Sequence, residues 1–115
     1  MPLATFPAHW APMSSLFYTG RQFPARYRGG VFIAFHGSWN RAPEPQEGYR
    51  VVFQPMADGR PSGAYETFAD GFAGDSVQPG TARHRPVGLA QGPDGAIYVT
   101  DDTGGRIWKV TYRGK

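Results

Sequence analysis

Short apolar runs separated by turn residues dominate the pattern of this chain. The strongest run, residues 31–35 (VFIAF), combines β-branched and aromatic side chains and is too short for a helix. It begins after Gly29-Gly30 and ends at His36-Gly37, so the pattern predicts a strand buried on both faces. Further strands are predicted at residues 15–18, 49–54, 65–68, 87–91, 96–100 and 106–112. The strand at 65–68 has a weaker pattern, which is typical of an edge strand. No segment has helical period at helical length, which predicts an all-β fold.

This pattern occurs twice. The segments SLFYTG, GGVFIAFHGS and GYRVVFQP are similar in character to GLAQGP, DGAIYVTDDTG and GRIWKVTY. Such repetition is typical of stacked β-units such as propeller blades. We therefore predict an extended connector at 1–13, a first four-stranded antiparallel blade at 14–68, a glycine-rich loop at 69–85 and a second, three-stranded blade at 86–115. Two blades cannot close a ring, so the pattern predicts a partial propeller.

Composition narrows the function classes. The chain has 115 residues, 16 of them glycine and 11 proline, but its 15% aromatic content argues against disorder. The net charge of +3 arises from scattered basic residues without a basic run, which disfavours nucleic-acid binding. The absence of cysteine excludes disulfides and thiolate sites and is compatible with the cytoplasm or the periplasm. No apolar stretch reaches the length of a membrane span, and the first residues lack the features of a signal peptide.

Two stretches carry candidate binding chemistry. The loop after the buried strand, His36 to Arg41, displays a hydroxyl, an indole, an amide and a guanidinium; alternatively, Trp39 fills a core and the rest closes a turn. Arg83 and Arg85 lie two residues apart, so in an extended segment both side chains point to the same side. Paired guanidinium groups suit an anionic ligand with carboxylates or phosphates. The alternative is a pair of solvated loop arginines.

Other polar residues give weaker evidence for a functional site. His9, His36 and His84 are too widely spaced to predict a shared metal site. Asp101 and Asp102 lie in a DDTGG turn, where a carboxylate is expected to bond nearby backbone N–H groups rather than a cation. The segment VFIAFHGS has the form of an oxyanion-hole strand of α/β-hydrolases, but the chain lacks both a G-x-S-x-G elbow and the helices of that fold.

Three longer segments, FYTGRQFPARYRGGVFIAFHGSWNR, GYRVVFQPMADGRPSG and RPVGLAQGPDGAIYVTDDTGGRIWKVTY, resemble the C-terminal part of the glucose/sorbosone dehydrogenases. The sorbosone dehydrogenase branch is the most similar, and the resemblance covers the chain from about His9 onward. It implies a six-bladed β-propeller, of which this chain supplies roughly the last two blades. It also implies pyrroloquinoline quinone (PQQ) as cofactor, calcium in the full-length protein, and oxidation of a sugar or aldose in the periplasm.

The resemblance also implies site residues. Arg85 and Arg83 are similar in position to an arginine pair that contacts PQQ in the soluble glucose dehydrogenase branch, and PQQ is a tricarboxylate. His36 falls near a cofactor-contacting lysine of that branch, and His9 falls near a polar cofactor contact. The general base and the calcium loop belong to earlier blades, so no catalytic residue and no metal ligand is expected here. An arginine aimed into an open tunnel is expected to contribute little to stability.

These features lead to three hypotheses. The first is a C-terminal fragment of a PQQ-dependent sugar dehydrogenase with hydride transfer to the quinone, inactive by itself. Its partners would be the sugar, the missing blades and a cytochrome or quinone electron acceptor. The second is a non-catalytic propeller segment that acts as a binding or interaction module. The third, a nucleic-acid-binding module, is the least consistent with the charge pattern.

Overall fold

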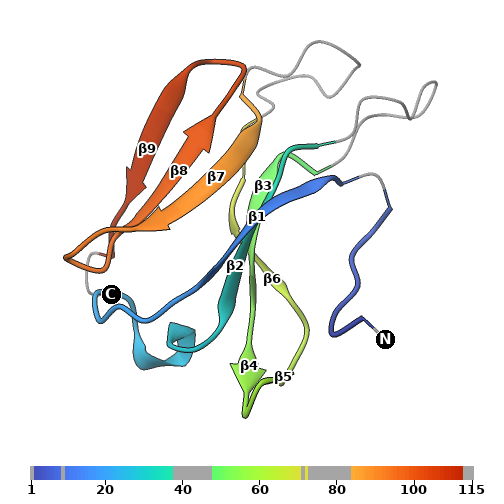
Figure 1. Cartoon of the computed structure of the whole chain (residues 1–115), viewed down its shortest axis with the longest axis vertical. Helices are drawn as coiled ribbons and strands as arrows, with labels where there is room; N and C mark the ends of the chain where they lie inside the picture. Colours follow the sequence, from blue (N-terminus) through green and yellow to red (C-terminus); the bar gives the residue numbers. More distant parts are fainter. Residues whose placement is uncertain (1, 9, 38–47, 71, 73–83, 113–115) are drawn as a thin grey trace.

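The computed structural model describes residues 2–8, 10–37, 48–70, 72 and 84–112, and all statements of structure concern these residues. Three antiparallel sheets make up the fold (Figure 1). The first has the order β1-β2-β3-β6, the second is the hairpin β4-β5, and the third has the order β7-β8-β9. The elements are β1 (Pro12–Phe17), η1 (Ala25–Tyr27, a 3-10 turn), β2 (Val31–Phe35), β3 (Arg50–Gln54), β4 (Met56–Ala57), β5 (Arg60–Pro61), β6 (Glu66–Ala69), β7 (Pro86–Gln91), β8 (Ile97–Asp101) and β9 (Arg106–Val110).

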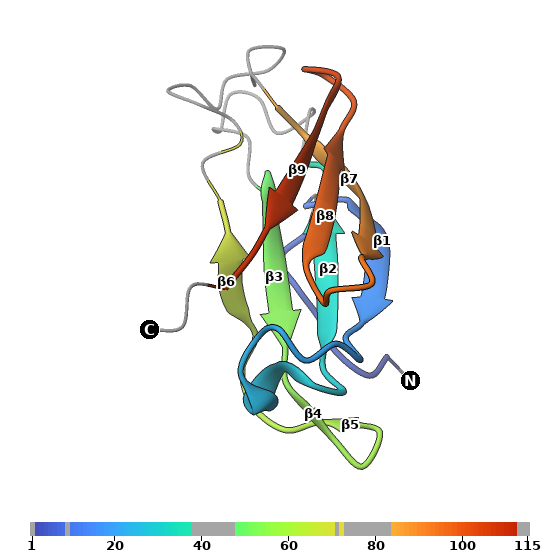
Figure 2. The ribbon, with the colours of Figure 1, turned by 90° about the vertical axis from the view of Figure 1, so that its left-hand side faces the viewer.

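The first and third sheets lie face to face (Figure 2). One apolar core fills the space between them, and both sheets contribute to it. Phe32 and Phe53 come from the first sheet and Ile97 and Val99 from the third, and all four are fully buried. Burial of each side chain of this size stabilises the folded state by about 1.5–3 kcal/mol. The two sheets therefore depend on a common core for their stability.

Strand β2 is covered on both faces, as its uninterrupted apolar sequence predicts. Phe32 and Ala34 point into the core between the sheets, whereas Phe35 belongs to a second cluster with Trp10 and Val52. The residues before β1 help to build that second cluster, because the ring of Phe6 lies 5.1 Å from the ring of Phe35. The predicted connector therefore includes core residues, and β1 begins inside it at Pro12.

The structure corrects the predicted fold class. The described residues form a small β-sandwich-like domain with three sheets, and the prediction of blades of a six-bladed β-propeller is wrong. The positions of the seven predicted strands are close to those of β1, β2, β3, β6, β7, β8 and β9. The alternating pattern determines strand positions and neighbours, but it does not determine how one sheet is placed on another. The sandwich follows from the shared core, which no local pattern reveals.

The apolar and polar pattern predicts neither the hairpin of β4 and β5 nor the 3-10 turn η1. Asp58 and Gly59 form the turn of a separate hairpin, in which Met56 pairs with Pro61 and Ala57 with Arg60. Both turn residues have positive φ, 52° for Asp58 and 75° for Gly59, as a tight Asp-Gly hairpin turn requires. The segment between β1 and β2 contains the 3-10 turn η1, which follows Pro24. These two-residue strands and single turns are too short to give a periodic signal.

Polar contacts join the two large sheets at one end. The hydroxyl of Tyr18 donates to the carbonyl oxygen of Gly95 at 2.6 Å and accepts from the N–H of Phe23 at 3.2 Å. Nearby, the amide nitrogen of Thr19 donates to the side-chain oxygen of Gln91 at 2.9 Å. The Tyr18 hydroxyl is buried and needs partners, so its bonds fix the relative placement of the sheets at this end, and the exposed Thr19–Gln91 bond adds to them. A second polar cluster joins them at the other end.

Candidate functional site

The second polar cluster lies where β2 ends, β3 begins, β7 begins and β8 ends. Arg85, which directly precedes β7, reaches the first sheet. Its Nε donates to the carbonyl oxygen of His36 at 3.0 Å and its Nη2 donates to the carbonyl oxygen of Gly37 at 2.6 Å. These bonds span 49 and 48 residues of sequence. Arg85 therefore clamps the exit of β2 to the entrance of β7. From these bonds we expect it to contribute to stability, in contrast to the expectation from its sequence position.

His36 is held by the third sheet in turn. Its Nε2 lies 2.9 Å from both carboxylate oxygens of Asp102, in the turn between β8 and β9. The His36 side chain is 18% exposed and that of Asp102 is 56% exposed, so the pair lies at the border with solvent. The N–H of His36 also donates to the carbonyl oxygen of Ala11 at 2.9 Å. His36 is consequently fixed by its backbone and by its ring.

Asp101 anchors the turn after β8. Its side chain is fully buried, and it accepts hydrogen bonds from the N–H groups of Arg85, Thr103 and Gly104 at 2.9, 2.9 and 3.0 Å. The Nδ1 of His84 lies 2.7 Å from its second oxygen. Burial acts to raise the pKa of Asp101, but the hydrogen bonds, led by that of Gly104, outweigh it and place this pKa below its ordinary value. The predicted turn role of Asp101 is confirmed, whereas Asp102 pairs with a histidine.

Tyr49, which directly precedes β3, completes the cluster. Its backbone has a φ of 54°, and its ring occupies the space that a Cβ at Gly37 would need. The Arg85 guanidinium lies 5.7 Å from the centre of the Tyr49 ring. Burial raises the pKa of the Tyr49 phenol, partly offset by the charge of Arg85. Gly37 therefore has two reasons to be glycine, since its φ of 100° and the closeness of the ring both exclude a side chain.

The structure brings together two of the four predicted cofactor-binding residues, His36 and Arg85. Arg83 and His9, as well as Ser38, Trp39, Asn40 and Arg41, lie outside the described residues. Sequence reasoning missed Tyr49, and it missed the partnership of Asp102 with His36. The sequence did contain a signal for this pairing. The HGS segment, with His36, and the DDTGG segment, with Asp102, each follow the buried strand of their repeat, so both are expected at the same end of their sheets.

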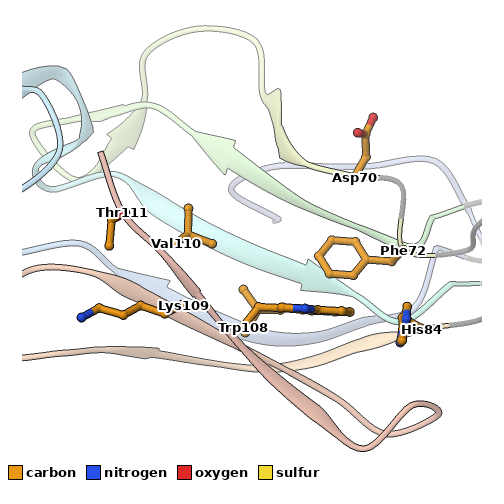
Figure 3. Close-up of a pocket in the computed structure, with 8 residues that line it drawn as sticks. Asp70, Phe72, His84, Trp108, Lys109, Val110 and Thr111 are labelled. Carbon is orange, nitrogen blue, oxygen red and sulfur yellow. The ribbon is translucent and has the colours of Figure 1, made fainter. Parts of the chain in front are cut away.

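A pocket of about 510 Å³ lies next to the polar cluster, and His84, which bonds Asp101, is part of its lining (Figure 3). It is lined by Asp70, Phe72, His84, Val99, Trp108, Lys109, Val110 and Thr111. The ring of Trp108 lies 5.1 Å from that of Phe72 and 4.7 Å from that of His84. Among the described residues, no group of three His, Asp or Glu side chains could hold a metal ion, and no helix is long and apolar enough to cross a membrane.

A family model described as TrAA12-like matches residues 1–113. The chain belongs to the TrAA12-like family. Two structures of Trichoderma reesei Carbohydrate-Active Enzymes Family AA12, one with iodide and one with calcium, match it with a TM-score of 0.68 and 24% identity. They cover 87% of this chain and 24% of the matched chain, which shows a shared fold. This membership corrects the resemblance stated from the motifs, because the chain is not the C-terminal portion of a sorbosone dehydrogenase.

Two curated relatives are similar over nearly the whole chain. An uncharacterized protein of Borreliella burgdorferi is 40% identical over 92% of this chain, and a pyrroloquinoline quinone-dependent pyranose dehydrogenase of Coprinopsis cinerea is 29% identical over 95% of it. The chain spans only 27% and 16% of the lengths of these relatives. The chain is thus related to an oxidoreductase that is several times longer.

Proposed function

We propose that this chain is the part of a PQQ-dependent oxidoreductase of the pyranose dehydrogenase type that holds carboxylates of the cofactor. The observation that carries the proposal is the Arg85 clamp, which fixes a guanidinium beside His36 in a chain related to a PQQ-dependent enzyme. PQQ would supply a quinone that accepts a hydride from a sugar. The proposal includes Arg83 and His9 as further contacts, on the strength of their sequence positions.

The donor set fits an anionic cofactor. Arg85 uses Nε and Nη2 for the two backbone carbonyls, which occupy one edge of the guanidinium. An arginine has five N–H donors, so the edge formed by Nη1 and Nη2 still presents two parallel N–H bonds to a carboxylate. The clamp fixes the plane of this fork, which lowers the entropy lost on binding. Arg85 would therefore both hold the sheets together and bind the ligand.

His36 would contribute the second contact. Its Nε2 is bonded to Asp102, which leaves Nδ1 as the ring atom that can face a ligand. Nδ1 would donate to a carboxylate in the imidazolium form, in which both ring nitrogens carry a hydrogen. A histidine that faces a carboxylate on one side has its ring orientation set, as in many metal and catalytic sites. Within this proposal, the role of Asp102 is to orient His36, and that of Tyr49 is to place its ring beside the guanidinium.

The test is a titration of PQQ into the chain, followed by quenching of tryptophan fluorescence. We expect saturable binding that Arg85→Ala weakens by about 1.5–3 kcal/mol, the range for a hydrogen bond to a charged group. Arg85→Lys should recover part of the loss, because a point charge replaces the fork only partially. Circular dichroism at the titration temperature establishes that each variant is folded.

Arg26→Ala serves as the matched control, since Arg26 forms an exposed ion pair with Glu66 at 3.0 Å far from the cluster. It should leave PQQ binding unchanged. Equal affinity of the parent chain and a folded Arg85→Ala variant would show that Arg85 is a structural clamp only. Equal loss in Arg26→Ala would show unspecific attraction of the tricarboxylate to positive charge.

A further inference from the structure

The pocket of about 510 Å³ opens between the two large sheets, next to the polar cluster. Its walls come from both sheets, since Phe72 follows β6 of the first sheet and Trp108 lies on β9 of the third (Figure 3). Phe72 and Val99 are buried at its inner side, whereas Asp70 and Thr111 are exposed at its rim. A pocket of this size, apolar inside and polar at the rim, has the form of a site for a small organic molecule.

Aromatic rings form the walls of this pocket. The ring of Trp108 extends from β9 toward Phe72 and His84 (Figure 3). Its centre lies 5.1 Å from that of the Phe72 ring, with the planes inclined at 57°, and 4.7 Å from that of the His84 ring, with the planes nearly perpendicular at 83°. Trp108 is only partly buried, so part of its ring is open to a ligand. Such walls favour a ligand that has an apolar face.

His84 adds a hydrogen-bond acceptor to the apolar walls. Its Nδ1 lies 2.7 Å from the carboxylate of Asp101, which its lowered pKa keeps ionised at neutral pH. In the neutral ring, Nδ1 therefore carries the hydrogen and donates it to Asp101, which leaves Nε2 as an acceptor. No residue in the described ranges bonds to Nε2.

Trp108 adds a donor, because its indole N–H bonds to no acceptor within the part of the chain that the structure describes. The exposed carboxylate of Asp70 adds acceptor oxygens at the rim. Lys109 lends the pocket no free charge, since its ammonium group pairs with Asp94 at 3.1 Å and its side chain points away from Trp108 (Figure 3). The described lining thus offers a donor and acceptors beside apolar rings, without an unpaired cation.

We propose that this pocket binds a neutral ring that carries several hydroxyl groups, specifically a pyranose sugar. A hydroxyl group both donates and accepts, so one hydroxyl donates to Nε2 of His84 while another accepts from the N–H of Trp108. The C–H face of the sugar ring lies against the aromatic wall. An anion would meet the carboxylate of Asp70 without a free cation, and a quaternary ammonium ion would leave the indole N–H unpaired.

This site goes beyond the proposed function, because it uses none of the residues proposed to contact the cofactor. Only the choice of a pyranose among hydroxylated rings rests on that function. Trp108 and His84 would bind the sugar through groups that face away from the bonds that hold the fold, since His84 uses Nδ1 for Asp101. Their variants can therefore separate binding from folding.

The test is a titration of methyl glucopyranoside into the isotope-labelled chain without PQQ, followed by nuclear magnetic resonance. The signal of the Trp108 indole N–H, which Trp108→Phe identifies by its loss, should shift in a saturable way. Trp108→Phe keeps an aromatic wall, and His84→Asn keeps an amide that can bond to Asp101. Each should weaken the affinity about three- to tenfold, as the loss of one hydrogen bond predicts. Circular dichroism establishes that each variant is folded.

Ile107→Ala is the matched control, because Ile107 is the neighbour of Trp108 on β9, is 70% exposed and lies outside the pocket lining. It should leave the affinity unchanged. Saturable binding that neither Trp108→Phe nor His84→Asn weakens would place the sugar elsewhere, and an indole signal that does not move would overturn the site.

Two further ligands test the chemistry in the parent chain. Cyclohexanol that binds as well as the glucoside would show an apolar pocket that does not recognise several hydroxyl groups, and choline that binds more tightly would show a cation site. A PQQ titration separates this inference from the proposed function. Glucoside binding in a chain that does not bind PQQ would overturn the cofactor site alone, and PQQ binding without glucoside binding would overturn the sugar site alone.

Discussion

At the scale of single residues, the site is built from side chains that bond to backbone. The Arg85 guanidinium holds two carbonyl oxygens, and the Asp101 carboxylate holds three N–H groups. A carboxylate or guanidinium used in this way positions loops that carry other groups, here His36 and Asp102. Ionised groups make stronger hydrogen bonds than neutral ones, so each of these residues contributes more to stability than its contact area indicates.

Replacing Arg85 tests the clamp apart from any ligand. Arg85→Ala leaves the carbonyl oxygens of His36 and Gly37 without their donor, and we expect the free energy of unfolding to fall by about 1.5–3 kcal/mol. Urea denaturation of the ligand-free chain measures this. Arg26→Ala removes an exposed ion pair, with side chains 55% and 44% exposed, and should change stability little. A loss no larger than that of Arg26→Ala would mean that the clamp does not hold in solution.

Asp101 gives the fold a dependence on acid. Its folded-state pKa is lowered, so the carboxylate stabilises the fold above its ordinary pKa of about 3.9, and this contribution is lost as the pH falls through the folded-state value. Asp101→Asn should lower stability at pH 7 by about 2 kcal/mol. The difference between the parent and the variant should shrink as the pH falls below 4, which melts at a series of pH values can follow.

Asp58→Asn is the control for this pH series. Asp58 is exposed in the turn of the β4-β5 hairpin, and asparagine also tolerates its positive φ of 52°. The stability of the Asp58→Asn variant should follow that of the parent chain at every pH. A constant gap between Asp101→Asn and the parent from pH 7 to pH 3 would contradict the lowered pKa of Asp101.

At the scale of elements, the sequence predicted where the strands lie, but not which distant residues hold the sheets together. The apolar run of β2 and the Asp-Gly pairs at 58–59 and 94–95 are local features of the sequence, and each lies at an observed strand or turn. The bonds that position the sheets join Tyr18 to Gly95, 77 residues apart, and Arg85 to His36, 49 residues apart. No periodicity records such distant partners. For the same reason, the sequence indicated His36 and Arg85 separately, while the pairing of His36 with Asp102 required the fold.

The bond between Tyr18 and Gly95 tests how the elements are joined. Tyr18→Phe keeps the buried ring but leaves the Gly95 carbonyl and the Phe23 N–H without a partner, so we expect a loss of about 1–3 kcal/mol. The matched control is Tyr112→Phe, because Tyr112 is 40% exposed. Thermal melts of the two variants compare the effects. Equal stabilities would show that water replaces the lost hydroxyl and that this joint does not hold the sheets.

At the scale of the whole molecule, the shared core makes the two large sheets one unit. Propeller blades and a sandwich are both built from similar antiparallel sheets. They differ in how the face of one sheet packs against the next sheet. That packing depends on side chains contributed from distant positions, such as Phe32 in β2 and Val99 in β8. The repeated pattern of strands and turns was therefore informative about the sheets and wrong about their assembly.

Ile97→Ala tests this unity. Ile97 is fully buried in β8 and belongs to the cluster that includes Phe32, Val51 and Phe53 of the first sheet. The cavity should cost about 2–5 kcal/mol, and because the core is common, amide exchange should accelerate in β2 and β3 as much as in β8. Ile107→Ala, at a position 70% exposed on β9, should have little effect on either sheet. If Ile97→Ala accelerates exchange in β7, β8 and β9 while β2 and β3 keep the protection of the parent chain, the two sheets fold as separate units and the single-core description fails.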